Sequence, residues 1–294
     1  MEKYSAFNLL KHAFSGHRHW PKSWRSPELK SSYDVVIIGG GGHGLATAYH
    51  LAKDHGIRNV AVLEKGWLGG GNTGRNTAVS RSNYFYPEST RFYEHSLKRY
   101  EGLSEELNYN IMFSQKGLVS LSFNRHEMEI FRRWANAIQV QGVDCEMLSR
   151  DQIAEMIPLL NMSAKARYPV QGGFIQRRGG ISRHDAVAWA FARAADNLGV
   201  DIIQNCEVTG LDVSEGRIRG VRTNLGDIRT SKVGSAVAGH STVVADMAGI
   251  KLPIVSQCLQ AMVSEPVKPC FDHIVVSPMV HCYVSQSDLS LIHI

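Results

Sequence analysis

The sequence predicts an α/β protein, because a strand, a helix and a second strand follow one another near its start. Residues Tyr33–Gly39 read YDVVIIG, a short β-branched apolar run typical of a central parallel strand. The helical pattern of Leu45–His55 ends at Gly56. Residues Asn59–Lys65, NVAVLEK, predict a second buried strand. A unit of this order crosses over with a right hand and begins a parallel sheet.

The rest of the chain mixes further helices with short strands. Helical patterns lie at Ser89–Leu107 and His126–Gln141, and an alternating pattern predicts a strand at Gly117–Phe123. Asp185–Gly199 predicts a helix that its last glycine closes. Several short strands follow, and the last of them runs into Gly239. Because the two kinds of element are interleaved, we expect two domains that are each discontinuous in sequence.

A glycine-rich turn separates the first strand from the helix. Gly39, Gly41 and Gly44 match the pattern G-x-G-x-x-G. Such glycines permit a tight turn and close backbone approach, while the helix N-terminus attracts the pyrophosphate of a dinucleotide. Glu64 ends the second strand, where an acid can accept hydrogen bonds from ribose hydroxyls. The turn therefore predicts a dinucleotide site on a Rossmann-type domain.

The segment after the second strand favours FAD over NAD. Residues 66–81 read GWLGGGNTGRNTAVSR, a loop long enough to wrap a flavin ring, whereas a nicotinamide enzyme usually continues with regular βαβ repeats. Downstream, NCEVTGL and KVGSAVAGHS resemble the second cofactor segment of FAD-dependent oxidoreductases. Val208 is expected to contact the adenine through its backbone, and Gly239 to let the chain approach the cofactor.

Other residues of the turn and the loop are also expected to bind FAD. His43 is expected to present its backbone amide to the pyrophosphate and to have no acid–base role. For Arg75, Asn76 and Thr77, the alternative to binding FAD is that they only shape the loop. The set is Gly42, His43, Gly71, Asn72, Thr73, Arg75, Asn76 and Thr77.

The predicted fold is thus an FAD-binding, glutathione-reductase-like domain interleaved with an incomplete antiparallel-sheet substrate domain. The expected segments are an N-terminal arm at 1–32, the FAD-binding domain at 33–110 and 184–250, the substrate or partner domain at 111–183 and 251–288, and a tail at 289–294.

Composition excludes several classes of function. The net charge of +5 comes from scattered lysines and arginines, so it does not indicate nucleic acid. No run approaches 18 apolar residues, so no membrane span is expected. Five cysteines without a CxxC pair predict reduced thiols in the cytoplasm and no metal site. The basic, histidine-rich residues 1–32 favour an arm that binds a partner, or an N-terminal extension without a special role, over a targeting peptide.

Several motifs together resemble one family of flavoproteins. They are SYDVVIIGGGGHGLATAYHLAKDHGIRNVAVLEKGWLGGGNTGRNT, RSNY, MFSQKG, RHDAVAWAFARAAD, VDIIQNCEVTG, AGHS and VSEPVKP. From about Trp24 to Ser287 the chain is similar to the beta subunits of heterotetrameric sarcosine oxidases, of the glycine and D-amino-acid oxidase superfamily. The resemblance implies noncovalent FAD that sarcosine reduces, a covalent FMN where oxygen becomes hydrogen peroxide, and alpha, gamma and delta partner subunits. The implied products are glycine and formaldehyde, or methylenetetrahydrofolate when tetrahydrofolate is supplied.

The resemblance carries the FMN attachment over to His184, in RHDAVAWAF. By residue type alone His184 is more simply a capping or solvated histidine. A helix N-terminus disfavours the imidazolium, which suits a histidine that must act as a neutral nucleophile. Arg177, Arg178 and Arg183 are expected to strengthen this effect and to attract the FMN phosphate.

The substrate side rests on one arginine. Arg81 follows the flavin-wrapping loop and resembles the arginine with which related oxidases bind a carboxylate, and a structural ion pair is an equal alternative. His281, in VHCYVSQ, could approach the FMN, although a histidine in a strand is more often structural. Tyr84 and Tyr86 are simply core aromatics on the plainer interpretation.

The likeness ends at SQSD, and LSLIHI does not continue the family pattern. The resemblance therefore predicts a C-terminally truncated member that lacks the last FAD segment, and an inactive fragment is one alternative. The others are a secondary-amine oxidase or dehydrogenase subunit for dimethylglycine, proline or an opine, a noncatalytic electron-transfer or assembly subunit, and, more remotely, a nicotinamide dehydrogenase.

Overall fold

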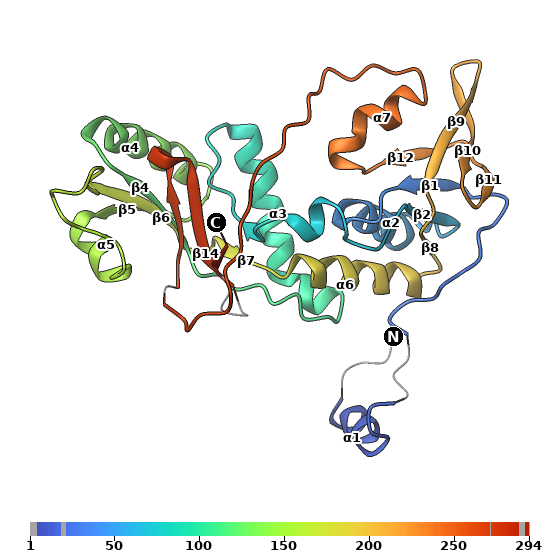
Figure 1. The fold of residues 1–294 in the computed structure, drawn as a ribbon, viewed down its shortest axis with the longest axis horizontal. Coiled ribbons are helices and arrows are strands. Elements are labelled where there is room, and N and C mark those ends of the chain that lie inside the picture. The colour runs from blue at the N-terminus through green and yellow to red at the C-terminus, as the bar shows by residue number, and fades with distance from the viewer. Residues whose placement is uncertain (1–4, 19–21, 271, 288–291, 294) are drawn as a thin grey trace. The chain divides into compact units, whose positions relative to one another are not determined.

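The computed structural model describes residues 5–18, 22–270, 272–287 and 292–293. The chain divides into two compact units, shown with the element labels in Figure 1. Unit 1 comprises Met1–Arg75, Leu107–Tyr109 and His184–Leu259; unit 2 comprises Asn76–Glu106, Asn110–Arg183 and Gln260–Ile294. Residues 76–106, which the sequence assigns to the FAD-binding domain, thus fall in unit 2. Of the predicted 289–294 tail, all but Ile292 and His293 lies outside the described residues.

Unit 1 is built on a four-stranded parallel sheet in the order β12-β1-β2-β8. Its strands are β1 (Val35–Ile38), β2 (Val60–Glu64), β8 (Asp201–Gln204) and β12 (Val233–Ser235). Helix α2 (Gly42–His55) contacts β1 and β2, and α6 (His184–Asn197) contacts α2 and β8. The predicted strand–helix–strand unit is confirmed, and so is the helix that ends before Gly199, whose φ is +96°.

A three-stranded antiparallel sheet, β11-β10-β9, packs on the parallel sheet within unit 1. Its strands are β9 (Val208–Ser214), β10 (Arg217–Thr223) and β11 (Gly226–Arg229). Leu211, Val221 and Ile228 join Val36 and Leu63 in one buried cluster. The strand predicted to run into Gly239 instead stops at Ser235, because the chain turns there into η2 (Ala238–His240) and α7 (Ser241–Asp246).

Unit 2 contains a six-stranded sheet in the order β15-β14-β13-β4-β6-β5. The strands are β4 (Leu118–Ser122), β5 (Cys145–Ser149), β6 (Gly172–Gln176), β13 (Ile274–Ser277), β14 (Cys282–Gln286) and β15 (Ile292–His293). All neighbours are antiparallel except β13 and β4, which are parallel. The second sheet predicted from the sequence is therefore present, with one parallel pair.

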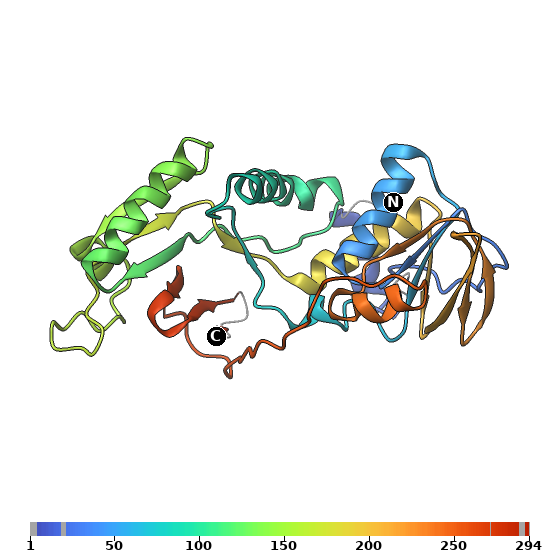
Figure 2. The same cartoon turned by 90° about the horizontal axis from the view of Figure 1, so that it is seen from above.

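Helices cover the sheet of unit 2. Helix α4 (Arg125–Gln139) lies along β4 and β5, as Figure 2 shows, and its Phe131 packs edge-on against Phe174. Helix α5 (Arg150–Met156) follows β5, and η3 (Pro278–Val280) joins β13 to β14. A short antiparallel ribbon of β3 (Val79–Ser80) and β7 (Gly180–Ile181) belongs to the same unit, as does α3 (Pro87–Glu106), which follows β3 in sequence.

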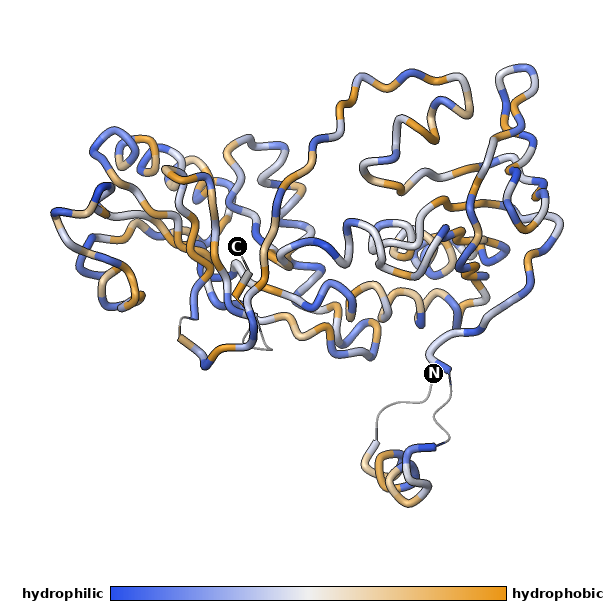
Figure 3. The backbone as a smooth tube through the Cα atoms, viewed as in Figure 1, coloured by the Kyte–Doolittle hydropathy of each residue, from blue (hydrophilic) through white to orange (hydrophobic). Residues whose placement is uncertain are grey.

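Apolar residues concentrate in the strands of the parallel sheet of unit 1 and of the six-stranded sheet of unit 2, as the orange segments of Figure 3 show. Helix α1 (Ala6–Phe14) differs, because its Phe7 and Phe14 are exposed. The arm is tied to unit 1 further on, where Arg25 Nε donates to Asp196 Oδ1 at 2.8 Å and Lys30 pairs with Asp201 at 2.6 Å. No helix in the described part of the chain is long and apolar enough to cross a membrane.

Candidate functional site

Two of the fingerprint glycines of unit 1, Gly39 and Gly44, occupy positions that no side chain could share. Gly39 has φ +110°, and a Cβ there would overlap the carbonyl of Ala236. A Cβ on Gly44 would overlap the carbonyl oxygen of Gly39, because α2 passes directly over the end of β1. Gly41 is the N-cap of α2 and brings no capping side chain. The turn is therefore a bare backbone surface at the start of a 14-residue helix.

The loop after β2 folds back onto this turn. Gly69 N–H donates to Gly40 O at 3.0 Å, and Gly42 N–H at the first turn of α2 donates to Thr73 Oγ1 at 3.0 Å. Thr73 lies in η1 (Asn72–Arg75), which contacts α6. The loop is thus ordered beside the helix N-terminus, where backbone N–H groups and the helix dipole favour an anion.

Glu64 ties the turn and the loop together. Its Oε2 accepts from Gly40 N–H at 2.8 Å and its Oε1 accepts from Gly66 N–H at 2.9 Å. A carboxylate has about four acceptor positions, so ribose hydroxyls could still bond to it. Gly40 and Glu64 can approach this closely only because Gly40 has no side chain: a Cβ there would lie 2.7 Å from the Cβ of Glu64.

These features fit a dinucleotide. They combine a side-chain-free turn, an anion-attracting helix start and a half-buried acid at the end of the second strand. Around them His43, Gly71, Asn72 and Arg75 are exposed.

The two residues of the second predicted cofactor segment differ in their surroundings. Val208 begins β9 and packs against the unit 1 core while half exposed. Gly239 is exposed in η2, and a Cβ there would meet only Ser256 Oγ, at an ordinary 3.7 Å. Space alone therefore does not require a glycine at 239, whereas it does at Gly39.

Asn76 and Thr77 shape their loop in this structure. Asn76 Oδ1 accepts from Ala78 N–H at 2.6 Å, and Ala78 has φ +64°. The buried Thr77 hydroxyl bonds to the hydroxyl of Tyr283. Both contacts lie within unit 2.

Arg81 lies in unit 2, half-buried among polar and aromatic groups. Its Nη1 donates to Asn83 Oδ1 at 2.9 Å, and its guanidinium lies 4.1 Å from the centre of the Tyr84 ring. Tyr84 stacks on Tyr93 at 3.9 Å, and burial raises the pKa of the Tyr84 hydroxyl. Arg81 makes no ion pair with any residue that the structure describes, and its hydrogen bonds go to Asn83. Tyr86 is exposed and is not a core residue.

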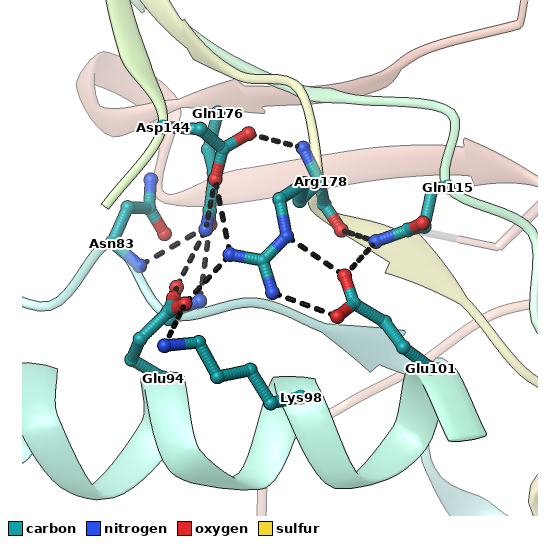
Figure 4. A network of polar contacts seen from close by, with 9 residues as sticks. Asn83, Glu94, Lys98, Glu101, Gln115, Asp144, Gln176 and Arg178 are labelled. Atoms are coloured by element: carbon teal, nitrogen blue, oxygen red, sulfur yellow. Dashed lines mark hydrogen bonds and ion pairs between the residues drawn. The ribbon is translucent and has the colours of Figure 1, made fainter. Parts of the chain in front are cut away.

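A polar network beside Arg81 was not predicted from the sequence (Figure 4). Gln176, fully buried at the end of β6, bonds to Ser82 and Asn83, which are 94 and 93 residues away in the chain. Ser82 bonds to the buried Glu94 of α3, and Glu94 pairs with Arg178 at 2.6 Å. Partners so distant in sequence share no spacing pattern, so no local signal could have revealed them.

His184 is the first residue of α6 and is half-buried, as the sequence predicted for a histidine at a helix start. The charge expected from two neighbouring arginines is, however, already neutralised. Arg177 forms two 2.7 Å hydrogen bonds with Glu146, and Arg178 bonds to both Glu94 and Glu101. The expectation that these two arginines attract a phosphate is therefore wrong.

His281 is not in a strand, contrary to the sequence prediction. It follows η3 at φ +49°, exposed in the turn that leads into β14. The turn reverses the chain between two antiparallel strands, which the apolar pattern around it concealed.

Comparison with known proteins decides the family. Residues 34–292 match the family described as FAD dependent oxidoreductase. The chain is 51% identical over 288 residues to sarcosine oxidase subunit beta of Rhodobacter capsulatus, covering 98% of this chain and 69% of that one. The chain belongs to the FAD dependent oxidoreductase family, among the sarcosine oxidase beta subunits. As a member, it is an oxidoreductase.

Two further comparisons agree with this family assignment. Sarcosine oxidase subunit beta of Rhizobium meliloti is 52% identical over 286 residues, 97% of this chain and 68% of that one. The solved structure of L-proline dehydrogenase from P. horikoshii matches with a TM-score of 0.81 and 27% identity over 90% of this chain and 70% of that one. The predicted fold class, oxidoreductase class and dependence on FAD are confirmed. The relatives are named as one subunit, which implies a multi-subunit complex.

Proposed function

We propose that this chain is the beta subunit that oxidises sarcosine with FAD and FMN, in complex with alpha, gamma and delta subunits. Sarcosine, oxygen and water would give glycine, formaldehyde and hydrogen peroxide, or 5,10-methylenetetrahydrofolate where tetrahydrofolate takes the one-carbon unit. The observation that carries the proposal is the 51% identity to a sarcosine oxidase beta subunit across 98% of the chain. The intact fingerprint turn supports it.

FAD would be held mainly by backbone. Gly39, Gly41 and Gly44 leave the turn open to the pyrophosphate, and the α2 N-terminus stabilises its charge. Glu64 would accept from the ribose hydroxyls, and Val208 would contact the adenine. When bound, FAD supplies an acceptor for the hydride that leaves the N-methyl carbon of sarcosine.

Arg81 would anchor the substrate carboxylate. Among its described contacts, only Nη1 is engaged, with Asn83, so its Nε and Nη2 donors can bind a carboxylate as a fork. Stacking on Tyr84 fixes the plane of that fork. Holding the carboxylate in one place orients the N-methyl group for hydride loss.

His184 would carry the FMN. Its place at the start of α6 disfavours the imidazolium, and the residue is half-buried and not part of the enclosed core. Unfolding the purified protein in acid and looking for flavin fluorescence on the polypeptide tests this role directly. His184→Ala should abolish the covalent flavin and leave the FAD content intact, and loss of both flavins from a folded protein would contradict two separate sites.

The reaction itself is tested by anaerobic addition of substrate to the assembled, flavin-loaded protein. Sarcosine should bleach the flavin absorbance at lower concentration than dimethylglycine or proline. Faster bleaching by one of those would favour the alternative amine oxidases, and no bleaching by any of them would favour a noncatalytic subunit.

A further inference from the structure

We propose that Gln176 is a positioning residue that holds Arg81 in place for recognition of the substrate carboxylate. This inference rests on the proposed role of Arg81. The two residues do not touch. Gln176 acts through the segment that directly follows Arg81, within unit 2.

Gln176 clamps the backbone of that segment. Its Oε1 accepts from the N–H groups of both Ser82, at 3.0 Å, and Asn83, at 3.2 Å. Its Nε2 donates to Ser82 Oγ at 2.6 Å. Gln176 and Ser82 are fully buried and Asn83 is 1% exposed, so no water can replace these contacts if they are lost.

Asn83 transmits the clamp to Arg81. Its Oδ1 accepts from Arg81 Nη1 at 2.9 Å, which holds the edge of the guanidinium, while Tyr84 holds its face. Arg81 and the three residues that follow it therefore form one ordered segment, and Gln176 fixes the middle two residues of that segment. A fork of donors that must meet a carboxylate in two places depends on such orientation.

The clamp is anchored in turn by charged groups on α3 and around β6. Ser82 Oγ donates to Glu94 Oε2 at 2.6 Å, and Glu94 Oε1 accepts from Arg178 Nη1 at 2.6 Å (Figure 4). Asp144 Oδ2 accepts from Arg178 N–H at 2.5 Å. Gln176, Ser82, Glu94 and Arg178 each make more than one of these contacts, which makes a single arrangement favourable.

The test is Gln176→Leu, which removes the amide at nearly constant volume, in the full protein with its subunits. Gln286→Leu is the matched control, because Gln286 is buried in the same unit and bonds in the same way to Val267, Lys268 and Cys270. The ligand is methoxyacetate, which keeps the carboxylate of sarcosine and replaces its amine by an ether oxygen. Kd is measured from its perturbation of the flavin spectrum, together with flavin content.

Gln176→Leu should raise the Kd of methoxyacetate and the KM of sarcosine about tenfold, as the loss of an oriented charged hydrogen bond does. Flavin content and the KM of sarcosinamide, which lacks the carboxylate, should stay within about twofold. Gln286→Leu should change none of them. An unchanged Kd, or an equal loss for sarcosine and sarcosinamide, would overturn the proposal.

Arg81→Lys separates this inference from the proposed function. If Arg81→Lys leaves the methoxyacetate Kd unchanged, the role of Arg81 fails, and the inference fails with it. If Arg81→Lys weakens binding, adding Gln176→Leu to that variant should raise the methoxyacetate Kd by less than about a further twofold. If the two substitutions instead raise the Kd by factors that multiply, Gln176 does not act through Arg81. Should Gln176→Leu not fold, Asn83→Ala decides, because it keeps the backbone clamp and cuts only the contact to Arg81: a raised Kd supports the proposal and an unchanged Kd overturns it.

Discussion

The glycine turn of unit 1 and the Arg81 cluster of unit 2 achieve order in opposite ways. At the turn, the backbone forms the binding surface, and Gly39 and Gly44 are required because a side chain would overlap a carbonyl group. Around Arg81, side chains from β6 and α3 hold a short segment through buried hydrogen bonds. The turn depends on the absence of side chains at its glycines, and the Arg81 cluster depends on partners that are distant in sequence.

The largest effect is expected at the turn. Gly44→Ala forces α2 away from the end of β1 and should lower the free energy of unfolding by about 3 kcal/mol or more, with loss of bound FAD. Gly234→Ala in the adjacent β12 is the control, since its Cβ would lie 3.7 Å from Ile37. Flavin released per polypeptide measures the difference, and a flavin-loaded Gly44→Ala protein would contradict the steric argument.

Two adjacent arginines sharpen the account of unit 2. Arg178→Ala leaves the buried Glu94 with Lys98, at 3.7 Å, as its remaining cation, and should cost about 3 kcal/mol, because a buried charge that loses its closest partner is expensive. Arg177→Ala removes a pair whose two side chains are 55% and 52% exposed, and should cost less than about 1 kcal/mol. Urea unfolding measures the free energy of unfolding of both variants, and equal losses would show that the network around Arg178 does not stabilise the unit.

Acid should weaken the same network. The hydrogen bond from Arg178 lowers the pKa of Glu101 below its ordinary 4.5, so the folded protein binds this proton less readily than the unfolded chain. The resulting stability is fully present above about pH 4.5 and is lost as the pH falls through the lower folded pKa. Glu101→Gln should therefore unfold about 1 kcal/mol more easily at pH 7, with the difference shrinking toward pH 3. Glu105→Gln, at an exposed position on the same helix, is the control and should change the free energy of unfolding at pH 7 by less than about 0.5 kcal/mol.

The last prediction concerns the chemical reactivity of a cysteine in the sheet of unit 2. Burial raises the pKa of the Cys145 thiol to about 12, so almost no thiolate forms near neutral pH. Iodoacetamide at pH 8 should modify Cys145 at least about 100-fold more slowly than the exposed Cys258. Peptide mapping over time measures both, and similar rates would show that β5 opens readily.

The difference between the regions also explains what the sequence could predict. The turn was predicted because strand, glycines, helix and Glu64 follow one another at spacings that backbone geometry imposes. The clamp was not predicted, because Ser82 and Gln176 are 94 positions apart and no repeating pattern joins them. The predictions for Arg177 and Arg178 failed for the same reason: their partners, Glu146, Glu94 and Glu101, are brought to them only by folding.

Anaerobic titration of wild type and Arg81→Lys with sarcosine tests the central claim, that cofactor and substrate depend on separate groups of residues. Both proteins should contain the same amount of FAD, and Arg81→Lys should need about tenfold more sarcosine to bleach it, because lysine cannot form the two-pronged contact. Loss of FAD from Arg81→Lys, or an unchanged sarcosine requirement, would contradict the account.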